Sequence, residues 1–201
     1  MIRFNQITFL ILVSLLVGCA ATGPAVDTGA PAIAKDLPKV DPKIAADYES
    51  ALSVMRNGKM TQAESALRQL AEKYPNYSGP RANLGILYFR ANKLDQAKSE
   101  FHEALKINPK NVVSLNHLGI INRGEGKFEE ANSFYEKALQ IDPDYAYAHL
   151  NFGILLELYM GKLNEALGHY KRYQELTKAE GKDEDKEVSK WIVDLGRRAK
   201  K

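Results

Sequence analysis

The sequence predicts an all-α fold made of repeated structural units, and three recurring features predict it. A Leu-Gly or Phe-Gly dipeptide recurs every 34 residues, at Leu84-Gly85, Leu118-Gly119 and Phe152-Gly153. Alanine recurs at the same spacing, at Ala63, Ala97 and Ala131. Proline does so at Pro75, Pro109 and Pro143. A period of this length is typical of a solenoid, in which each repeat stacks on its neighbours to bury a continuous core.

This pattern resembles the tetratricopeptide repeat, whose motif is L-G-x2-Y…A-x3-F…P on a 34-residue period. The second unit matches it nearly in full, through Leu84-Gly85, Tyr88, Ala97, Phe101, Ala104 and Pro109. The resemblance implies a right-handed superhelical solenoid of about four antiparallel helix pairs. It also implies that the repeated glycines and alanines lie where helices approach closely, and that large residues fill the space between neighbouring pairs, at Tyr88, Phe101 and Tyr135.

We expect four units within residues 40–179, at about 44–77, 78–111, 112–145 and 146–179. The first is degenerate, with Ser50-Ala51 where Leu-Gly would stand. The fourth carries one inserted residue near Tyr159 to Gly161, because Ala166 follows Ala131 by 35 residues. Terminal repeats are expected to be atypical. The changes in the fourth unit have two interpretations, an adjustment for capping or a partner site.

A final helix is predicted over residues 183–200. Its apolar residues fall at helical spacing on one face, at Val188, Trp191, Ile192 and Leu195. Acidic residues precede this segment and basic residues end it, which suits the helix dipole. The pattern predicts a capping helix over the last repeat. The alternative is a detachable helix that binds a partner or the membrane.

The first 18 residues predict a secretory signal. Arg3 is its positive region, and Ile7 to Val17 is an eleven-residue apolar run, too short to span a hydrocarbon core of about 30 Å. Leu16-Val17-Gly18-Cys19 resembles the bacterial lipobox, in which the cysteine becomes the first mature residue and carries lipid. A thiolate is well suited to that chemistry. The alternatives are an ordinary signal peptide with a chance cysteine, or an uncleaved anchor.

Residues 19–39 predict a lipidated cysteine followed by a disordered tether, because they are rich in Ala, Pro, Gly and Thr and show no helical or strand period. The tether would reach at most about 70 Å when extended. Ala20 follows the cysteine where some lipoproteins have Asp. In Gram-negative lipoproteins this resemblance implies the outer membrane, facing the periplasm. The choice of membrane stays open for a Gram-positive source.

Charge and motifs exclude several classes of function. The net charge of +3 is too weak to indicate a nucleic-acid partner. The four histidines fall at unrelated repeat positions and form no ligand pair of the H-E-x-x-H kind. No nucleophile elbow or phosphate-binding loop is present. We therefore expect no enzyme activity, catalytic residue, metal, cofactor or small-molecule substrate.

The concave surface of such a solenoid is a groove for an extended peptide or a helix. We expect its lining to come from the first helix of each unit. We interpret it as accepting an apolar segment with acidic groups that pair with Arg56, Arg90 and Arg123. Alternatively, the apolar residues pack against each other or the cap, and the arginines are solvated. The candidate groove residues are Tyr48, Leu52, Met55, Arg56, Ala82, Ile86, Phe89, Arg90, Asn116, Ile120, Arg123, Tyr147, Leu150, Ile154 and Glu157.

These features together predict a lipid-anchored adaptor that binds partner proteins at the bacterial cell envelope. The resemblance extends loosely to pilotin-like lipoproteins of type IV pilus assembly, which help a secretin ring insert and assemble. A role in pilus or secretion-system secretin assembly is therefore the second interpretation. An accessory subunit of a cell-wall enzyme is the third. The sequence names neither the partner nor the oligomeric state.

Overall fold

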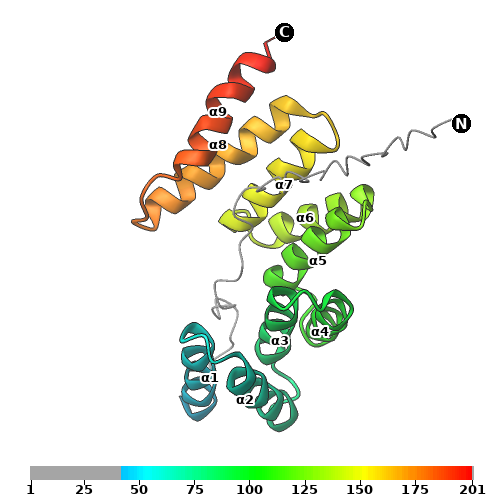
Figure 1. Ribbon diagram of the computed structural model, residues 1–201, viewed down its shortest axis with the longest axis vertical. Helices are drawn as coiled ribbons and strands as arrows, with labels where there is room; N and C mark the ends of the chain where they lie inside the picture. The colour runs from blue at the N-terminus through cyan, green and yellow to red at the C-terminus, as the bar shows by residue number, and fades with distance from the viewer. Residues whose placement is uncertain (1–41, 201) are drawn as a thin grey trace, which may run out of the picture.

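The computed structural model describes residues 42–200, which form nine α-helices joined by short turns (Figure 1). The predicted signal, the lipidation site Cys19 and the tether lie outside the described residues. Within the described range, no helix combines the length and apolar character that a membrane span needs. The helices are α1 (Pro42–Arg56), α2 (Met60–Lys73), α3 (Ser78–Arg90), α4 (Leu94–Ile107), α5 (Val112–Gly124), α6 (Phe128–Ile141), α7 (Ala146–Leu158), α8 (Leu163–Ala179) and α9 (Lys186–Arg198).

The first eight helices form four pairs, which stack in chain order from α1–α2 to α7–α8 (Figure 1). Within the stack, the second helix of each pair packs on the first helix of the next. The first helices α3, α5 and α7 also contact one another in turn, so they form the inner face of the curve. The all-α solenoid that the 34-residue period predicts is confirmed.

In three of the pairs, a glycine on the first helix faces an aromatic ring on the second helix. A Cβ atom on Gly85 would stand 2.6 Å from the ring of Phe101, and one on Gly119 would stand 2.5 Å from Tyr135. Gly153 meets Tyr170 in the same way, at 2.6 Å. Small residues are needed at these positions because the aromatic ring of the second helix fills the space that a side chain on the first helix would occupy.

The same rings also contact the next pair, as the sequence predicts for Phe101 and Tyr135. The ring of Phe101 stacks on His117 of α5, with centroids 5.0 Å apart. Tyr135 stacks on Phe152 of α7 at 5.7 Å. Each buried ring thus joins its own pair to the following one, which makes the core continuous along the solenoid.

The turn inside each pair has one residue in the left-handed region, with φ of +74° at Gly58, +55° at Asn92, +76° at Gly126 and +67° at Gly161. The first three turns have three residues between helices, and the fourth, residues 159–162, has four. The structure therefore places the inserted residue of the fourth unit in the turn between α7 and α8.

The predicted capping helix is α9, which packs on α8. Val188 and Leu195 are buried there, and the ring of Trp191 lies 5.5 Å from that of Tyr170. The helix begins after Asp185, whose side chain accepts hydrogen bonds from the backbone N–H groups of Glu187 and Val188. An amphipathic helix capped in this way covers the apolar face that the last pair would otherwise expose.

Candidate partner-binding surface

The inner face is built from corresponding positions of α1, α3, α5 and α7. Because the repeat is 34 residues, each position on one inner helix has a counterpart on the next. One such row is apolar at every helix and consists of Leu52, Ile86, Ile120 and Ile154. Another row changes character along the stack and consists of Tyr48, Ala82, Asn116 and Leu150.

Most of the apolar candidates lie inside the solenoid. Ile86, for example, has no exposed surface, because the inner helices of neighbouring pairs pack directly on one another. Except for Tyr48, which also lines the pocket described below, these side chains could contact a partner only if the pairs separated. The buried candidates are Tyr48, Leu52, Met55, Ala82, Ile86, Asn116, Ile120, Leu150 and Ile154.

The six other candidates reach the surface, and the partner-binding prediction is narrowed to them. Arg56 and Arg90 are exposed, while Phe89, Arg123, Tyr147 and Glu157 are half-buried. Arg56 forms an ion pair with Glu49 of its own helix. Arg123 donates a hydrogen bond from Nη1 to the backbone carbonyl of Asn151, at 3.2 Å. The exposed part of the inner face is therefore mainly basic and aromatic over α1, α3 and α5.

The last inner helix has the opposite charge, and the cap neutralises it. Arg198 of α9 reaches Glu157 at the end of α7, with 2.6 Å between Nη1 and Oε1. The hydroxyl of Tyr170 also donates to this carboxylate, at 3.1 Å. Glu157 therefore holds the cap on the stack, a role that its place in the repeat does not reveal.

An apolar pocket at the opposite end of the solenoid was not predicted. It lies where α1, the end of α2 and the start of α3 meet, and Tyr48 is its only member among the groove candidates. At its border, Asp47 accepts hydrogen bonds from Lys73 and Tyr74, and these contacts lower the pKa of Asp47. In the sequence, the pocket could have been recognised from the two tyrosines of the short Y-P-N-Y connection between α2 and α3. The pocket is lined by Ile44, Ala45, Tyr48, Leu70, Tyr74, Tyr77, Gly79 and Pro80.

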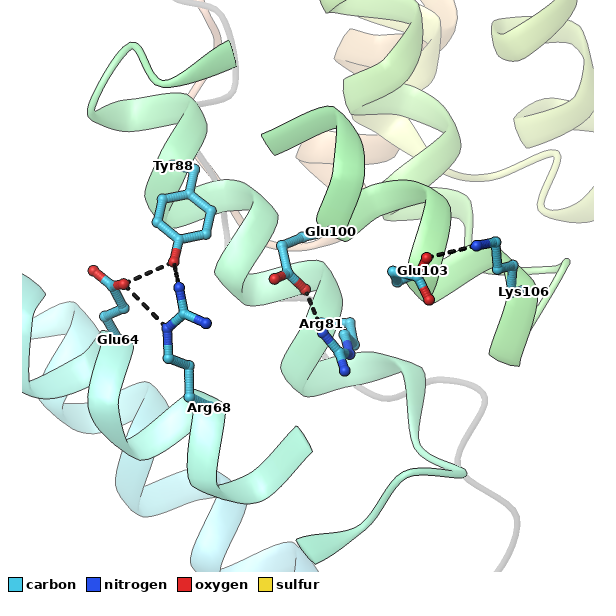
Figure 2. Close-up of polar contacts among 7 residues, drawn as sticks. All are labelled: Glu64, Arg68, Arg81, Tyr88, Glu100, Glu103 and Lys106. Atoms are coloured by element: carbon cyan, nitrogen blue, oxygen red, sulfur yellow. Dashed lines mark hydrogen bonds and ion pairs between the residues drawn. The ribbon is translucent and has the colours of Figure 1, made fainter. Parts of the chain in front are cut away.

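Polar contacts between α2 and α3 join the first pair of helices to the second. Figure 2 shows Tyr88 of α3 pointing toward Glu64 and Arg68 of α2. The Tyr88 hydroxyl donates to Glu64 at 2.7 Å and also contacts Arg68. The hydrogen bond from Tyr88, reinforced by Arg68, lowers the pKa of the Glu64 carboxyl. These groups bond to each other and orient the pairs.

Two further ion pairs in Figure 2 stabilise the second pair of helices. Arg81 of α3 lies 3.1 Å from Glu100 of α4, so this contact joins the two helices of the pair. Glu103 and Lys106 pair along the exposed side of α4, at 2.6 Å. Both ion pairs therefore have a role in the packing or stability of the second pair of helices.

Two histidines form a neutral pair between α7 and α8. His149 donates from Nε2 to the carbonyl of Pro143, at 2.9 Å, so its Nδ1 accepts a hydrogen bond from Nδ1 of His169, also at 2.9 Å. Burial, together with the neighbouring His149, lowers the pKa of His169 to about 4. Among residues 42–200, no group of three or more His, Cys, Asp or Glu side chains could hold a metal ion. The hydrogen bond between the two histidines joins the last two repeat helices, α7 and α8.

Comparisons with known proteins agree with this architecture. Family models of the tetratricopeptide repeat match residues 54–115 and residues 123–158. A search of the curated proteins gives no significant match. The chain is similar to the structure of PilF from Pseudomonas aeruginosa, with 22% identity and a TM-score of 0.66 over 78% of this chain and 69% of that one.

Two further solved structures share the fold. MamA has 20% identity and a TM-score of 0.56, over 70% of this chain and 81% of its own. A tetratricopeptide repeat protein from Parabacteroides merdae has 21% identity and a TM-score of 0.53, over 69% of this chain and 55% of that one. The periodic sequence, the stacked helix pairs and the family matches together show that residues 54–158 of the chain contain tetratricopeptide repeats, which form a scaffold for protein–protein contacts.

Proposed function

We propose that this protein is a lipid-anchored adaptor, which holds a partner protein at the bacterial cell envelope. The observation that carries the proposal is an arginine near the end of each of the first three inner helices, with Arg56 and Arg90 at the same repeat position and Arg123 one position earlier. One arginine per repeat along a curved surface is suited to a partner segment that carries acidic groups at intervals.

The environment of Arg56 allows a partner carboxylate to take the place of its present ion-pair partner. The ion pair of Arg56 with Glu49 is well exposed, with 46% and 64% of the two side chains accessible. Such pairs contribute little to stability, so a partner carboxylate can replace Glu49 at small cost. Phe89 is half-buried beside exposed Arg90 and supplies an apolar contact. The partner that this surface fits is an apolar segment with acidic residues.

The anchor part of the proposal rests on the sequence around Cys19. A lipobox-like LVGC follows an apolar run of signal-peptide length. Several acyl chains on one cysteine would hold the protein on a membrane stably, whereas one chain would bind only marginally. The tether would then let the solenoid stand about 25 Å from the membrane surface on average. We place it on the outer membrane, facing the periplasm, because Ala20 follows the cysteine.

A more specific version of this function is a pilotin-like role in assembly of a type IV pilus or secretion-system secretin. The supporting observation is the similarity of fold to PilF, over 78% of this chain, together with the lipobox-like sequence. In this version, the acidic and apolar segment on the inner face would belong to a secretin subunit.

The anchor is tested by fractionation of cell envelopes from strains that express the wild type or Cys19→Ser, followed by chemical crosslinking. We expect the wild type in the membrane fraction and the variant in the soluble fraction, with the partner crosslinked only to the anchored form. Equal membrane fractions for the two proteins would show that Cys19 is not the anchor.

A further inference from the structure

The turn between α1 and α2 contains an asparagine followed by a glycine, Asn57-Gly58. Residues 56–60 are all exposed, and no other asparagine of the chain is followed by glycine. Gly58 has φ of +74°, and apart from its chain neighbours no atom lies within 4 Å of the place where its Cβ would stand. The side-chain amide of Asn57 and the backbone nitrogen of Gly58 are therefore neighbours on an open surface, with no side chain between them.

The backbone of this turn is held by the last hydrogen bonds of a helix end. The N–H of Gly58 donates to the carbonyl of Met55 at 3.1 Å, and that of Lys59 donates to the carbonyl of Val54 at 3.2 Å. This pattern is common where a glycine in the left-handed region ends a helix. Helix ends open locally at a small cost in free energy. Loss of the single bond to Met55 is enough to free the nitrogen of Gly58.

An asparagine amide can react with the backbone nitrogen that follows it. The nitrogen of Gly58 loses its proton to solvent and attacks Cγ of Asn57, which closes a five-membered succinimide ring. Nδ2 of Asn57 takes up a proton and leaves as ammonia. Water then opens the ring at either of its two carbonyl carbons and gives aspartate or isoaspartate. One water is consumed and one ammonia is released, without oxidation or reduction. Glycine favours the ring closure because it has no Cβ to hinder the approach.

Two other asparagines show why this position is set apart. Asn92 is exposed in the matching turn of the second repeat, but the next residue, Lys93, carries a side chain. Asn132 is followed by the small Ser133, but both lie inside α6, where helical hydrogen bonds hold the backbone. An exposed asparagine, a following glycine and a helix end thus coincide at Asn57.

We propose that Asn57 is a site of slow self-modification, at which the chain exchanges a neutral amide for a carboxylate next to Arg56. Arg56 is exposed and already pairs with Glu49, so the new carboxylate brings a second acidic group to this arginine. A negative charge at the C-terminal end of α1 is also unfavourable in the helix dipole. The modified chain therefore offers Arg56 less readily to the acidic segment of a partner. This consequence rests on the proposed function, whereas the reaction itself does not.

Peptide mapping by mass spectrometry tests the reaction on the purified full chain, incubated at neutral and at mildly alkaline pH. We expect Asn57 to be converted at least about tenfold faster than Asn92 in the same sample, with both aspartate and isoaspartate formed. The rate rises with pH because the attacking nitrogen must lose its proton. Conversion of Asn57 no faster than that of Asn92, or a product without isoaspartate, overturns the proposal.

A matched variant keeps the turn and removes the reactive pair. Asn57→Ala combined with Gly58→Asn copies Ala91-Asn92 of the second repeat, and asparagine tolerates the left-handed conformation. We expect the asparagine introduced at position 58 to be converted as slowly as Asn92. Conversion at the rate of Asn57 in the wild type would show that the glycine does not direct the reaction.

Asn57→Asp tests the consequence for the partner, by chemical crosslinking in cell envelopes. We expect the yield of crosslinked partner to fall at least about threefold relative to the wild type. Asn164→Asp, at an exposed position of α8, is the matched control and keeps the yield. Equal yields for the two variants overturn the effect on the partner. Because the mass measurement needs no partner, failure of the reaction is distinguishable from failure of the adaptor function.

Discussion

The first and fourth helix pairs solve the same packing problem in different ways. In the fourth pair, Gly153 faces the ring of Tyr170, and the outer side is covered by α9. In the first pair, the corresponding positions hold Ala51 and Leu67, both buried. A larger residue on one helix thus accompanies a smaller one on the other. The difference shows that the repeat conserves the total volume between its helices more strictly than the identity of either residue.

The two ends also differ in how they finish the solenoid. The C-terminal end is closed by a capping helix joined to α7 through Arg198 and Glu157. The described N-terminal end instead carries an apolar pocket among tyrosines, including Tyr48 and Tyr74. A solenoid needs its terminal repeats to protect the core. Here, one end does so with an added helix and the other with aromatic side chains of the first repeat.

The largest expected effect comes from breaking the volume balance in a middle pair. Gly119→Ala places a Cβ 2.5 Å from the ring of Tyr135, and we expect it to lower the free energy of unfolding by about 3 kcal/mol. Adding Tyr135→Leu copies the Ala and Leu combination of the first pair. The double variant should recover at least about 1 kcal/mol, measured by urea denaturation. A double variant no more stable than Gly119→Ala would contradict the volume argument.

Weakening the cap should have the next largest effect, confined to one end. Leu195 on α9 has no exposed surface, and Leu195→Ala should cost about 2–3 kcal/mol. Hydrogen exchange should accelerate in α8 and α9 and stay unchanged in α1 and α2, because stability in solenoids spreads between neighbours. Val193→Ala, on the exposed side of α9, is the control. Equal acceleration at both ends would show that the cap acts on the whole molecule.

A pH effect should distinguish the fourth pair from the first, which contains no histidine. The folded state holds the pKa of His169 at about 4, below its unfolded value of about 6.5. The unfolded chain therefore binds the proton first, so stability is complete above about pH 6.5 and falls as the pH is lowered toward 4.

The loss should be on the order of 1–2 kcal/mol, since the site is only partly shielded from water. Charged neighbours of the pair are Arg172, Asp144 and Asp142. The measurement is urea denaturation between pH 7 and pH 4.5 for the wild type and His169→Phe. A slope that His169→Phe leaves unaltered would assign the pH effect to other groups.

The smallest effect concerns the turns. Asn92 is the residue other than glycine in the left-handed region among residues 42–200, with φ of +55°. Asn92→Gly should stabilise the protein by at most about 0.5 kcal/mol, whereas Gly126→Ala at the matching turn should destabilise it by about 1 kcal/mol. Thermal unfolding of both variants measures the contrast. A stabilising Gly126→Ala would show that the turns tolerate any residue.

The sequence predicted the helix pairs well because the same residue types recur every 34 positions. It predicted α9 well because apolar residues fall on one face of a helix there. It also placed the inserted residue in the turn at Tyr159 to Gly161, since Ala166 lies 35 residues after Ala131. The inner surface was predicted less well, because nine candidates are buried. Helical periodicity identifies the faces of a helix, but the rotation between successive pairs decides which part of a face stays open.

Two features could not be predicted from the 34-residue repeat pattern. The pairing of Arg198 with Glu157 joins residues 41 positions apart in different elements, and nothing in either local sequence predicts it. The apolar pocket depends on Gly79 and on tyrosines from the Y-P-N-Y connection. These contacts arise from tertiary packing at the two ends, where the repeat no longer constrains the neighbours.

In the proposed function, the arginines of the inner face hold the partner. The most direct test compares crosslinking to the envelope partner for the wild type and for a triple variant, Arg56→Gln, Arg90→Gln and Arg123→Gln. The matched control replaces three exposed lysines of the outer helices, Lys106, Lys137 and Lys171, by Gln. We predict that the inner-face variant loses the crosslinked partner at least about tenfold, because each charge-assisted contact contributes over about 1 kcal/mol, while the control retains it. Equal retention of the partner by both variants would show that Arg56, Arg90 and Arg123 do not hold it.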